Sequence, residues 1–327
     1  MRAKRKGALA LAAACLMGLA ACGLQPSTSG IEPVGPGKIK PIPGAKGTKV
    51  TVGSKAFTEQ LILGKIAVYT AEASGFDVVD MTSIPGSQPA RQLMVNGETN
   101  LGWEYTGTAW LTYMGHTHGM ANQKAQWKAV SDQDRPNGIT WGKPSKLNNT
   151  YALAVREEYA KEEGIEKLSD IAKLPPAKRT LCVDAEFNSR TDGLNPLLSK
   201  YGIPRGNPNG VPEQNVSVMD TGTIYTATDR GSCNFGEVFS TDGRIKSLNL
   251  RVLKDDLGFF PAYNVSPVYA TSLVKKFPKL RAYFDQMAPL LTDDEMREMN
   301  LKVDVEGQDP SKVAREWLIS KGFVTKK

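Results

Sequence analysis

The chain has 327 residues, of which 41 are Lys or Arg and 34 are Asp or Glu, giving a formal net charge of +7. Four of the basic residues lie within the first six positions, so the rest of the chain has 37 basic residues against 34 acidic ones. A net charge near +3 is ordinary for a globular protein, and it gives no reason to expect binding to nucleic acid.

The first 21 residues have the pattern of a secretory signal peptide. A basic start at residues 2–6 is followed by an apolar run from Ala8 to Ala21. The run is shorter than the roughly 20 apolar residues of a membrane-spanning helix, which favours a signal peptide over a short membrane helix. The sequence Leu-Ala-Ala-Cys-Gly resembles a bacterial lipobox, in which Cys22 is acylated and becomes the new N-terminus. This resemblance implies an exported protein anchored to the outer face of the plasma membrane, and several acyl chains make such an anchor stable.

Residues 22–48 are expected to form a flexible tether that begins at the lipidated cysteine. The segment holds five prolines and several glycines and shows no apolar periodicity, a composition typical of an unfolded linker. The body that follows, residues 49–323, is large for a single hydrophobic core. Its length therefore predicts two domains.

Strand patterns alternate with helical patterns along this body. The runs 49–53, 76–84 and 101–105 are typical of strands, and each is followed by a turn and a segment with helical spacing. Further strands are expected at 147–155, 179–183, 233–239, 251–253 and 265–270, before a helical C-terminal tail. Repeated strand–helix units favour an α/β fold with a mainly parallel sheet.

Two cysteines remain once Cys15 is assigned to the signal peptide and Cys22 to the lipid site. Cys182 and Cys233 form an even pair in an exported protein, so they are candidates for one disulfide, and two buried thiols are the alternative. Their separation does not fit a zinc site, which uses closely spaced Cys or His ligands. We predict neither a metal site nor a cofactor.

The sequence offers little for catalysis, although an enzyme is the first alternative class of function. The chain contains only two histidines, His116 and His118, and it has no Gly-x-Ser-x-Gly, P-loop or dinucleotide-binding motif. Asp184 and Glu186 are paired carboxylates at a strand end, where they could act as acid and base, but ion pairing or solvation is the simpler explanation. We therefore expect no enzymatic activity.

Aromatic and cationic residues stand at the ends of predicted strands, where α/β lobes bind ligands. A quaternary ammonium group has no N–H to donate, so proteins hold it by aromatic faces, and a carboxylate on the same ligand needs cationic donors. The aromatic candidates are Tyr105, Tyr151, Phe239 and Tyr263. The polar candidates are Lys55, Thr108 and Arg190. Taken singly, an aromatic residue is more often part of a core and a cation is more often solvated.

Six short motifs occur in order along nearly the whole body. They are 53–60 (GSKAFTEQ), 103–108 (WEYTGT), 148–153 (NNTYAL), 186–193 (EFNSRTDG), 239–245 (FSTDGRI) and 261–267 (PAYNVSP). Together they resemble the extracytoplasmic binding proteins of glycine betaine/choline/carnitine ABC importers. Each motif is weak alone, whereas six in order are specific for the family.

The resemblance implies a two-lobe periplasmic-binding-protein fold of type II, with two crossovers and the ligand in the interlobe cleft. One lobe would comprise residues 49–146 and 242–323, and the other residues 147–241. The aromatic candidates match the family's cage, and the polar candidates match its carboxylate contacts, with Asn149 adding main-chain contacts. Phe239 departs from the Tyr that is common at this position, which would lower the affinity or change the ligand.

The resemblance also implies the function and the partners. The chain would be the solute-binding component of an ABC importer, capturing glycine betaine or a related quaternary-ammonium solute for the importer's membrane subunits. Two cations, Lys55 and Arg190, favour a carboxylated ligand over choline. Two alternatives stay open, a binding protein for a different zwitterion or amino acid and a surface lipoprotein that holds partner proteins.

Overall fold

The computed structural model describes residues 32–120 and 122–327. The predicted signal peptide (1–21), with Cys15, and the predicted lipid site Cys22 lie outside the described residues. Within the two described ranges, no helix combines the length and the apolarity that crossing a membrane requires.

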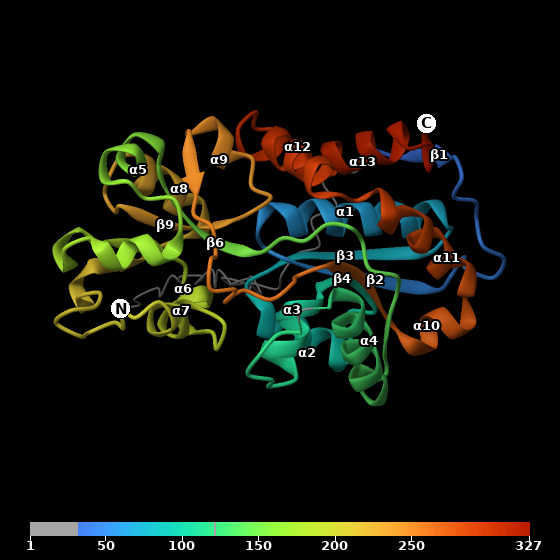
Figure 1. Cartoon of the computed structure of the whole chain (residues 1–327). Helices are drawn as coiled ribbons and strands as arrows, with labels where there is room; N and C mark the ends of the chain where they lie inside the picture. The colour runs from blue at the N-terminus through green and yellow to red at the C-terminus, as the bar shows by residue number, and fades with distance from the viewer. Residues whose placement is uncertain (1–31, 121) are drawn as a thin grey trace, which may run out of the picture.

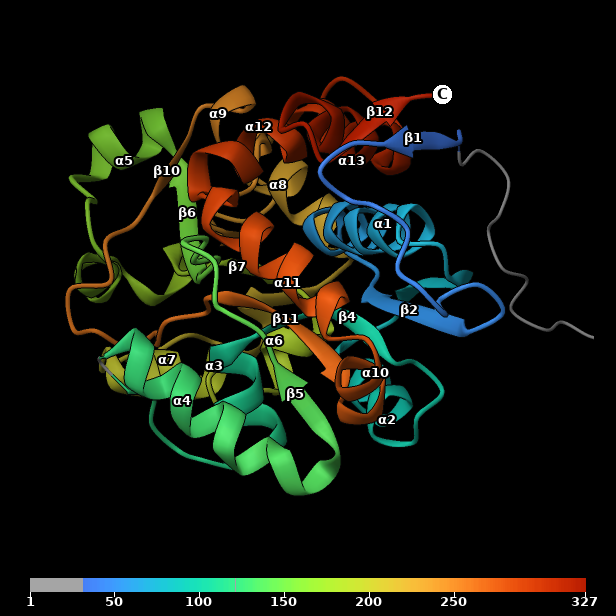
Figure 2. The ribbon, with the colours of Figure 1, turned by 90° about the vertical axis from the view of Figure 1, so that its right-hand side faces the viewer.

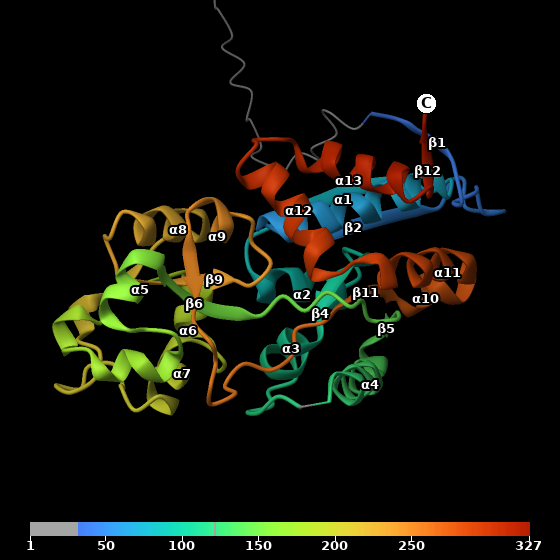
Figure 3. The same ribbon diagram turned by 45° about the horizontal axis from the view of Figure 1, so that its top comes forward.

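Two mixed β-sheets, each packed with helices, form two lobes that lie side by side (Figure 1 and Figure 3). The first sheet consists of β2 (Lys49–Lys55), β3 (Asp77–Ile84), β4 (Leu101–Tyr105), β5 (Ile139–Trp141) and β11 (Val265–Ala270). Their order is β3-β2-β4-β11-β5. Strand β2 is parallel to β3 and β4, whereas β11 is antiparallel to β4 and β5.

Helices cover both faces of the first sheet. Figure 1 shows three of them above it: α1 (Thr58–Ala73), α12 (Asp293–Asp304) and α13 (Pro310–Ser320). Below it lie α2 (Ser87–Val95), α3 (Thr106–Thr108) and α4 (Gln123–Asp134), and α10 (Thr271–Lys276) and α11 (Pro278–Met287) flank its outer end. Ile62, Ile66 and Tyr69 follow helical spacing in α1 and are almost fully buried, so this helix lies at the centre of the first lobe's core.

The second sheet consists of β6 (Tyr151–Arg156), β7 (Leu181–Val183), β8 (Val216–Val218), β9 (Phe235–Phe239) and β10 (Leu250–Val252). Their order is β10-β6-β9-β7-β8, with β7 parallel to β8 and β9 and with β6 antiparallel to β9 and β10. The helices of this lobe are α5 (Glu157–Glu163), α6 (Ala185–Ser189), α7 (Leu194–Lys200), α8 (Thr221–Asp229) and α9 (Arg244–Ser247).

The sheets are less parallel than the sequence suggested. In each lobe three neighbouring strands are parallel, and the strand that follows a passage between the lobes joins them in the antiparallel direction. These strands are β6 and β11. The alternation of strand and helix patterns in the sequence could not predict the antiparallel direction of β6 and β11. It does not show where the chain passes from one lobe to the other.

The chain passes between the lobes twice, after β5 and after β10. The second passage comes later than the expected boundary at residue 242, because β10 pairs with β6 in the second sheet, with Leu250 opposite Arg156. Leu253 is 3% exposed and packs in the core of the second lobe. Burial of these leucines at the edge of the sheet keeps the chain in the second lobe through residue 253.

Residues 34–48, which we expected in the flexible tether, belong to the first lobe. β1 (Val34–Pro36) pairs with β12 (Val324–Lys326) near the C-terminus, as Figure 2 shows. Ile39 and Ala45 are fully buried, and Ile42 is 8% exposed. The sequence concealed this because the apolar residues recur without a strand or helix period and pack singly against the lobe.

Replacing Ile39 with Ala should lower the free energy of unfolding by about 2–5 kcal/mol, because it removes buried apolar groups and leaves a cavity. Leu257→Ala, at a side chain that is 47% exposed, should change it by less than about 0.5 kcal/mol. Chemical denaturation measures both values. An Ile39→Ala protein as stable as the Leu257→Ala protein would show that this segment is not part of the folded lobe.

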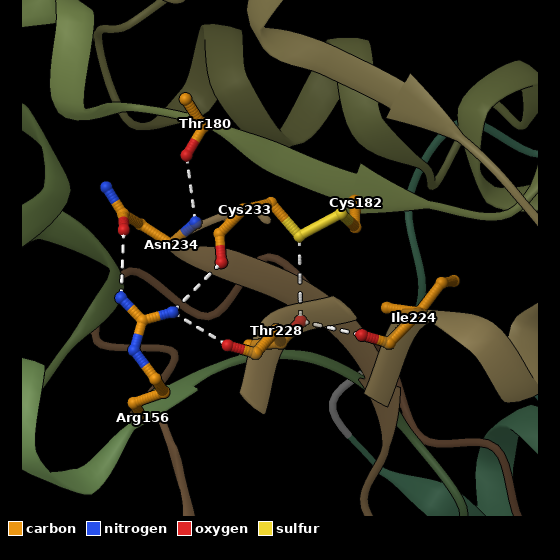
Figure 4. The surroundings of a disulfide bond; sticks show 7 residues. All are labelled: Arg156, Thr180, Cys182, Ile224, Thr228, Cys233 and Asn234. Atoms are coloured by element: carbon orange, nitrogen blue, oxygen red, sulfur yellow. Dashed lines mark hydrogen bonds between the residues drawn. A yellow bond between two sulfur atoms is a disulfide. The ribbon is translucent and has the colours of Figure 1, made fainter. Parts of the chain in front are cut away.

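A disulfide joins Cys182 of β7 to Cys233, which precedes β9 (Figure 4). Their Cα atoms are 5.8 Å apart, and both residues are buried. Beside the bond, the Arg156 guanidinium donates to the carbonyl oxygens of Thr228 (2.7 Å) and Cys233 (3.3 Å) and to Oδ1 of Asn234 (3.1 Å). The disulfide ties the turn before β9 to β7, and the guanidinium of Arg156 ties the same turn to β6 and to the end of α8.

The Cys182→Ala/Cys233→Ala variant should lose about 2–4 kcal/mol of unfolding free energy, because the unfolded chain regains the entropy that closing a 51-residue separation removes. The wild-type protein should lose the same amount in reductant, whereas the variant should not respond to reductant. Denaturation with and without reductant measures both effects. Equal stability of the wild type in the two conditions would contradict the prediction.

Candidate functional site

A cavity of about 590 Å³ lies between the two lobes. The first lobe contributes the segments 55–59 and 85–87 and the residues that follow β4, and the second lobe contributes 184–186, 219–222 and the end of β9. The carboxyl ends of β2, β4, β7 and β9 therefore converge on it, which is where open α/β sheets bind ligands.

Seven of the eight predicted ligand-binding residues line this cavity: Lys55, Tyr105, Thr108, Asn149, Tyr151, Phe239 and Tyr263. The eighth, Arg190, is not among the lining residues. Its side chain is buried, and its guanidinium lies over the ring of Tyr151, 5.3 Å from the ring centroid. Arg190 therefore contacts the wall of the cavity through Tyr151.

Five aromatic rings form a connected row along this wall. Phe57 stacks on Phe239, with 5.1 Å between ring centroids, and on Tyr105 at 6.1 Å. Tyr151 lies 5.4 Å from Phe239 and 5.8 Å from Tyr263, whose ring is nearly perpendicular to it at 87°. Rings of several orientations thus surround one space, which suits a cation with an apolar surface.

Phe57 was not predicted as a site residue. It is the second residue after β2 and the N-cap residue of α1, within the same 53–60 motif that contains Lys55. An aromatic residue at the carboxyl end of a strand is the signal that led to Tyr105 and Phe239. The strand expected at 49–53 ended too early to give this signal at Phe57, because β2 extends to Lys55.

The tyrosine hydroxyl groups of the wall hold the rings in place. Burial raises the pKa of Tyr105, Tyr151 and Tyr263 well above the ordinary value, so these phenols remain neutral donors. The Tyr105 hydroxyl donates to Glu59 Oε1 at 2.7 Å, and the Tyr263 hydroxyl donates to Asp192. Two of the three rings are therefore oriented by buried carboxylates.

The two cations expected to bind a carboxylate are both paired with carboxylates of the protein. Lys55 Nζ lies 2.6 Å from Glu104 Oε1. Arg190 donates from Nε and Nη2 to Asp192, at 2.7 and 2.6 Å, and from Nη1 to Glu186 at 3.0 Å. Both cations that we expected to bind a carboxylate of the solute therefore already have carboxylate partners in the protein. A ligand carboxylate would have to share them with the protein.

Glu186 ties the two lobes together across the cavity. It belongs to α6 of the second lobe, and it accepts hydrogen bonds from the Ser87 amide (3.2 Å) and hydroxyl (2.5 Å) at the start of α2 in the first lobe. Burial raises the pKa of Glu186, but Lys55, Ser87 and Arg190 outweigh this effect and hold the pKa below its ordinary value. The link is therefore made by an ionised carboxylate.

Glu59 is a second acidic residue of the wall that was not predicted. It lies in the first turn of α1, is 2% exposed and accepts hydrogen bonds from Tyr105, Asn149 and Thr241. Asn149 thus contributes its side chain to the wall, beyond the main-chain role that we expected. In the sequence, an acidic residue in the first turn of a helix has an ordinary explanation in the helix dipole.

Two residues considered as candidates for catalysis, His116 and Asp184, make contacts that stabilise the fold. The His116 ring stacks on Trp110 with 3.4 Å between centroids, and its Nε2 lies 2.9 Å from Gln133 Oε1. Asp184 caps α6 by accepting from the Phe187 amide at 2.7 Å. Across residues 32–120 and 122–327, no three His, Cys, Asp or Glu side chains are grouped to hold a metal ion.

Comparison with known proteins relates this geometry to one family. Residues 48–320 match the family described as the substrate-binding domain of ABC-type glycine betaine transport systems. The glycine-betaine-binding protein of Pseudomonas aeruginosa is 36% identical over 282 residues, which cover 84% of this chain and 88% of that protein. The glycine betaine-binding protein YehZ of Escherichia coli is 28% identical over 84% of this chain and 91% of its own.

The same relationship holds for solved structures. The crystal structure of a glycine betaine/carnitine/choline ABC transporter protein superimposes with a TM-score of 0.68 at 25% sequence identity, covering 84% of this chain and 99% of the other. The mixed α/β architecture with two sheets is therefore that of known substrate-binding proteins.

Asp192→Asn should lower the free energy of unfolding by about 3–5 kcal/mol, because it leaves the buried Arg190 with only one of its two carboxylate partners. The matched variant Asp132→Asn removes a carboxylate from exposed pairs with Lys128 and Arg135, and its stability should stay close to that of the wild type. Chemical denaturation compares the two. A loss at Asp192 no larger than at Asp132 would contradict the assignment of a buried ion pair.

Proposed function

The chain belongs to the family of substrate-binding domains of ABC-type glycine betaine transport systems, and we propose that its cavity captures a small quaternary-ammonium solute such as glycine betaine. It delivers this solute to the membrane subunits of an ABC importer. The sequence Leu-Ala-Ala-Cys-Gly supports the further proposal that lipidated Cys22 anchors the protein to the outer face of the plasma membrane.

The row of five aromatic rings carries this proposal. Each aromatic face that contacts a cation contributes about 0.5–2 kcal/mol, with the larger values in desolvated sites. Two faces of the row already lie against cations of the protein, since Lys55 Nζ is 4.9 Å from the Tyr105 centroid and the Arg190 guanidinium is 5.3 Å from that of Tyr151. Faces of these two rings thus already bind positive charge within the protein.

A carboxylate on the solute has a partner at Lys55. An ammonium group carries three N–H donors, and the pair with Glu104 uses one of them. Lys55 lines the cavity together with Thr108, so the two can bind a carboxylate while Glu104 keeps its ion pair. This arrangement supports glycine betaine as the solute without requiring Arg190 to leave its partners.

The two lobes contribute different parts of the wall, which couples binding to closure. Phe57, Tyr105 and Tyr263 come from the first lobe, whereas Tyr151 and Phe239 come from the second. A solute that contacts both sets has a higher affinity for the closed arrangement, and only such a difference can shift the equilibrium towards closure. The closed form is the one we propose the membrane subunits recognise.

The direct test is calorimetric titration of the full chain with glycine betaine, choline, carnitine and proline. We expect saturable one-to-one binding of at least one quaternary-ammonium solute and none of proline. Phe239→Leu keeps the apolar bulk but removes one aromatic face, so it should weaken that binding about 2- to 30-fold.

Phe259→Leu is the matched control, because Phe259 is half-buried, packs on Phe260 and does not belong to the cavity wall. It should bind like the wild type. Binding of proline with no quaternary-ammonium solute bound would refute the proposed function. An equal loss in the two variants would show that the aromatic face at Phe239 does not contact the solute.

A further inference from the structure

Glu59 is an unusual feature of the cavity wall because all the groups that bind its carboxylate are neutral. Oε1 accepts from the Tyr105 hydroxyl (2.7 Å) and from Asn149 Nδ2 (3.0 Å), and Oε2 accepts from the Thr241 hydroxyl (2.7 Å). The residue is 2% exposed and lines the cavity. Its charge is therefore hydrogen bonded but is not balanced by any of these partners.

Three other buried carboxylates around the cavity each lie against a cation of the protein. These pairs are Glu104 with Lys55, Asp192 with Arg190, and Asp242 with Arg244. Asp184 and Asp220 also line the cavity, but Asp184 is only partly buried and Asp220 is exposed to solvent. Glu237 is a further buried carboxylate with a neutral donor, since its Oε2 accepts from the Asp184 amide at 2.7 Å, but it does not line the cavity. Glu59 thus differs from these neighbours in lining the cavity while being both buried and surrounded by neutral donors.

The hydrogen bonds favour the ionised form of this carboxyl group. Asn149 Nδ2 can only donate, so Oε1 must accept from it in either protonation state. Three donors on one carboxylate stabilise its charge, but burial in the cavity wall outweighs them and raises the pKa of Glu59. A cation inside the cavity would restore the balance, and aromatic rings line the same cavity as Glu59.

We propose that Glu59 is the counter-charge of the solute's ammonium group and that it makes the cavity select a cationic group over a neutral group of the same shape. This inference rests on the proposed function and deepens it, because it assigns the charge selectivity of the site to one residue. The aromatic rings bind the apolar surface of the trimethylammonium group, and Glu59 supplies the attraction that a neutral group lacks.

The test compares solutes that differ only in this charge. In 3,3-dimethylbutan-1-ol a carbon atom replaces the nitrogen of choline, and in 3,3-dimethylbutanoate a carbon replaces the nitrogen of glycine betaine. The wild-type chain should bind the ammonium member of a pair at least about tenfold more tightly than the carbon member. Glu59→Gln should remove most of this preference, by weakening the ammonium solute about tenfold or more and leaving the carbon analogue unchanged or tighter.

Glu72→Gln is the matched control, since Glu72 lies in the last turn of the same helix, is partly buried and does not line the cavity. It should keep the full preference of the wild type. Glu59→Asp retains the charge on a shorter side chain, so it should keep the preference between the members of a pair even if both bind more weakly. This variant also covers the case in which Glu59→Gln does not fold.

The outcomes separate the two proposals. A wild-type chain that binds no quaternary-ammonium solute refutes the proposed function, and this inference with it. A wild-type chain that binds one, with a preference that Glu59→Gln leaves intact, refutes this inference alone. Equal weakening of both members of a pair by Glu59→Gln assigns Glu59 a purely structural role and also refutes it. If Glu59→Asp, which keeps the charge, loses the preference for the ammonium member of a pair, the inference is refuted as well.

Discussion

Buried carboxylates are the constraint around which the cleft is organised. Removing an ionised group from water costs several kcal/mol unless a nearby cation and hydrogen bonds compensate for it. Glu104 is compensated by Lys55, and Asp192 and Glu186 are compensated by Arg190. The cations that a reading of the sequence assigns to the solute are therefore already needed by the protein. Because these carboxylates and cations already compensate one another, recognition of the solute depends mainly on the aromatic rings and on the hydrogen-bond donors that the protein does not use itself.

The same network connects the lobes. Arg190 supports the ring of Tyr151 from one side, and its partner Glu186 accepts from Ser87 in the other lobe. Its second partner, Asp192, accepts from the hydroxyl group of Tyr263. Aromatic rings from both lobes are thus fixed to one set of ionised groups. Opening the cleft would have to separate these hydrogen bonds, and a solute that fills the space between the rings opposes that separation.

The sequence could predict the parts of the site that depend on local position. Tyr105 and Phe239 end predicted strands, whereas Phe57 was missed because the strand before it was predicted to end at residue 53 and β2 extends to Lys55. Glu59 could not be found in this way, because its significance comes from tertiary contacts, including one with Thr241. The packing of residues 34–48 on the first lobe could not be predicted for a related reason. Isolated apolar side chains that are buried one at a time produce no helical or strand periodicity in the sequence. The lobe boundary depends on the sheet with which β10 pairs. Strand pairing between distant segments cannot be deduced from the composition of β10.

The Phe at position 239 is easier to understand in this setting. Two tyrosines of the wall direct their hydroxyl groups to buried carboxylates, Tyr105 to Glu59 and Tyr263 to Asp192. Phe239 is partly buried and lines the cavity, so a hydroxyl group at this position would find a polar partner in the protein or in the water of the cavity. Phe239 needs none, and its ring still bridges Phe57 and Tyr151 in the aromatic row. The departure from Tyr therefore removes a hydroxyl group from the cavity wall while preserving an aromatic face and the continuity of the row.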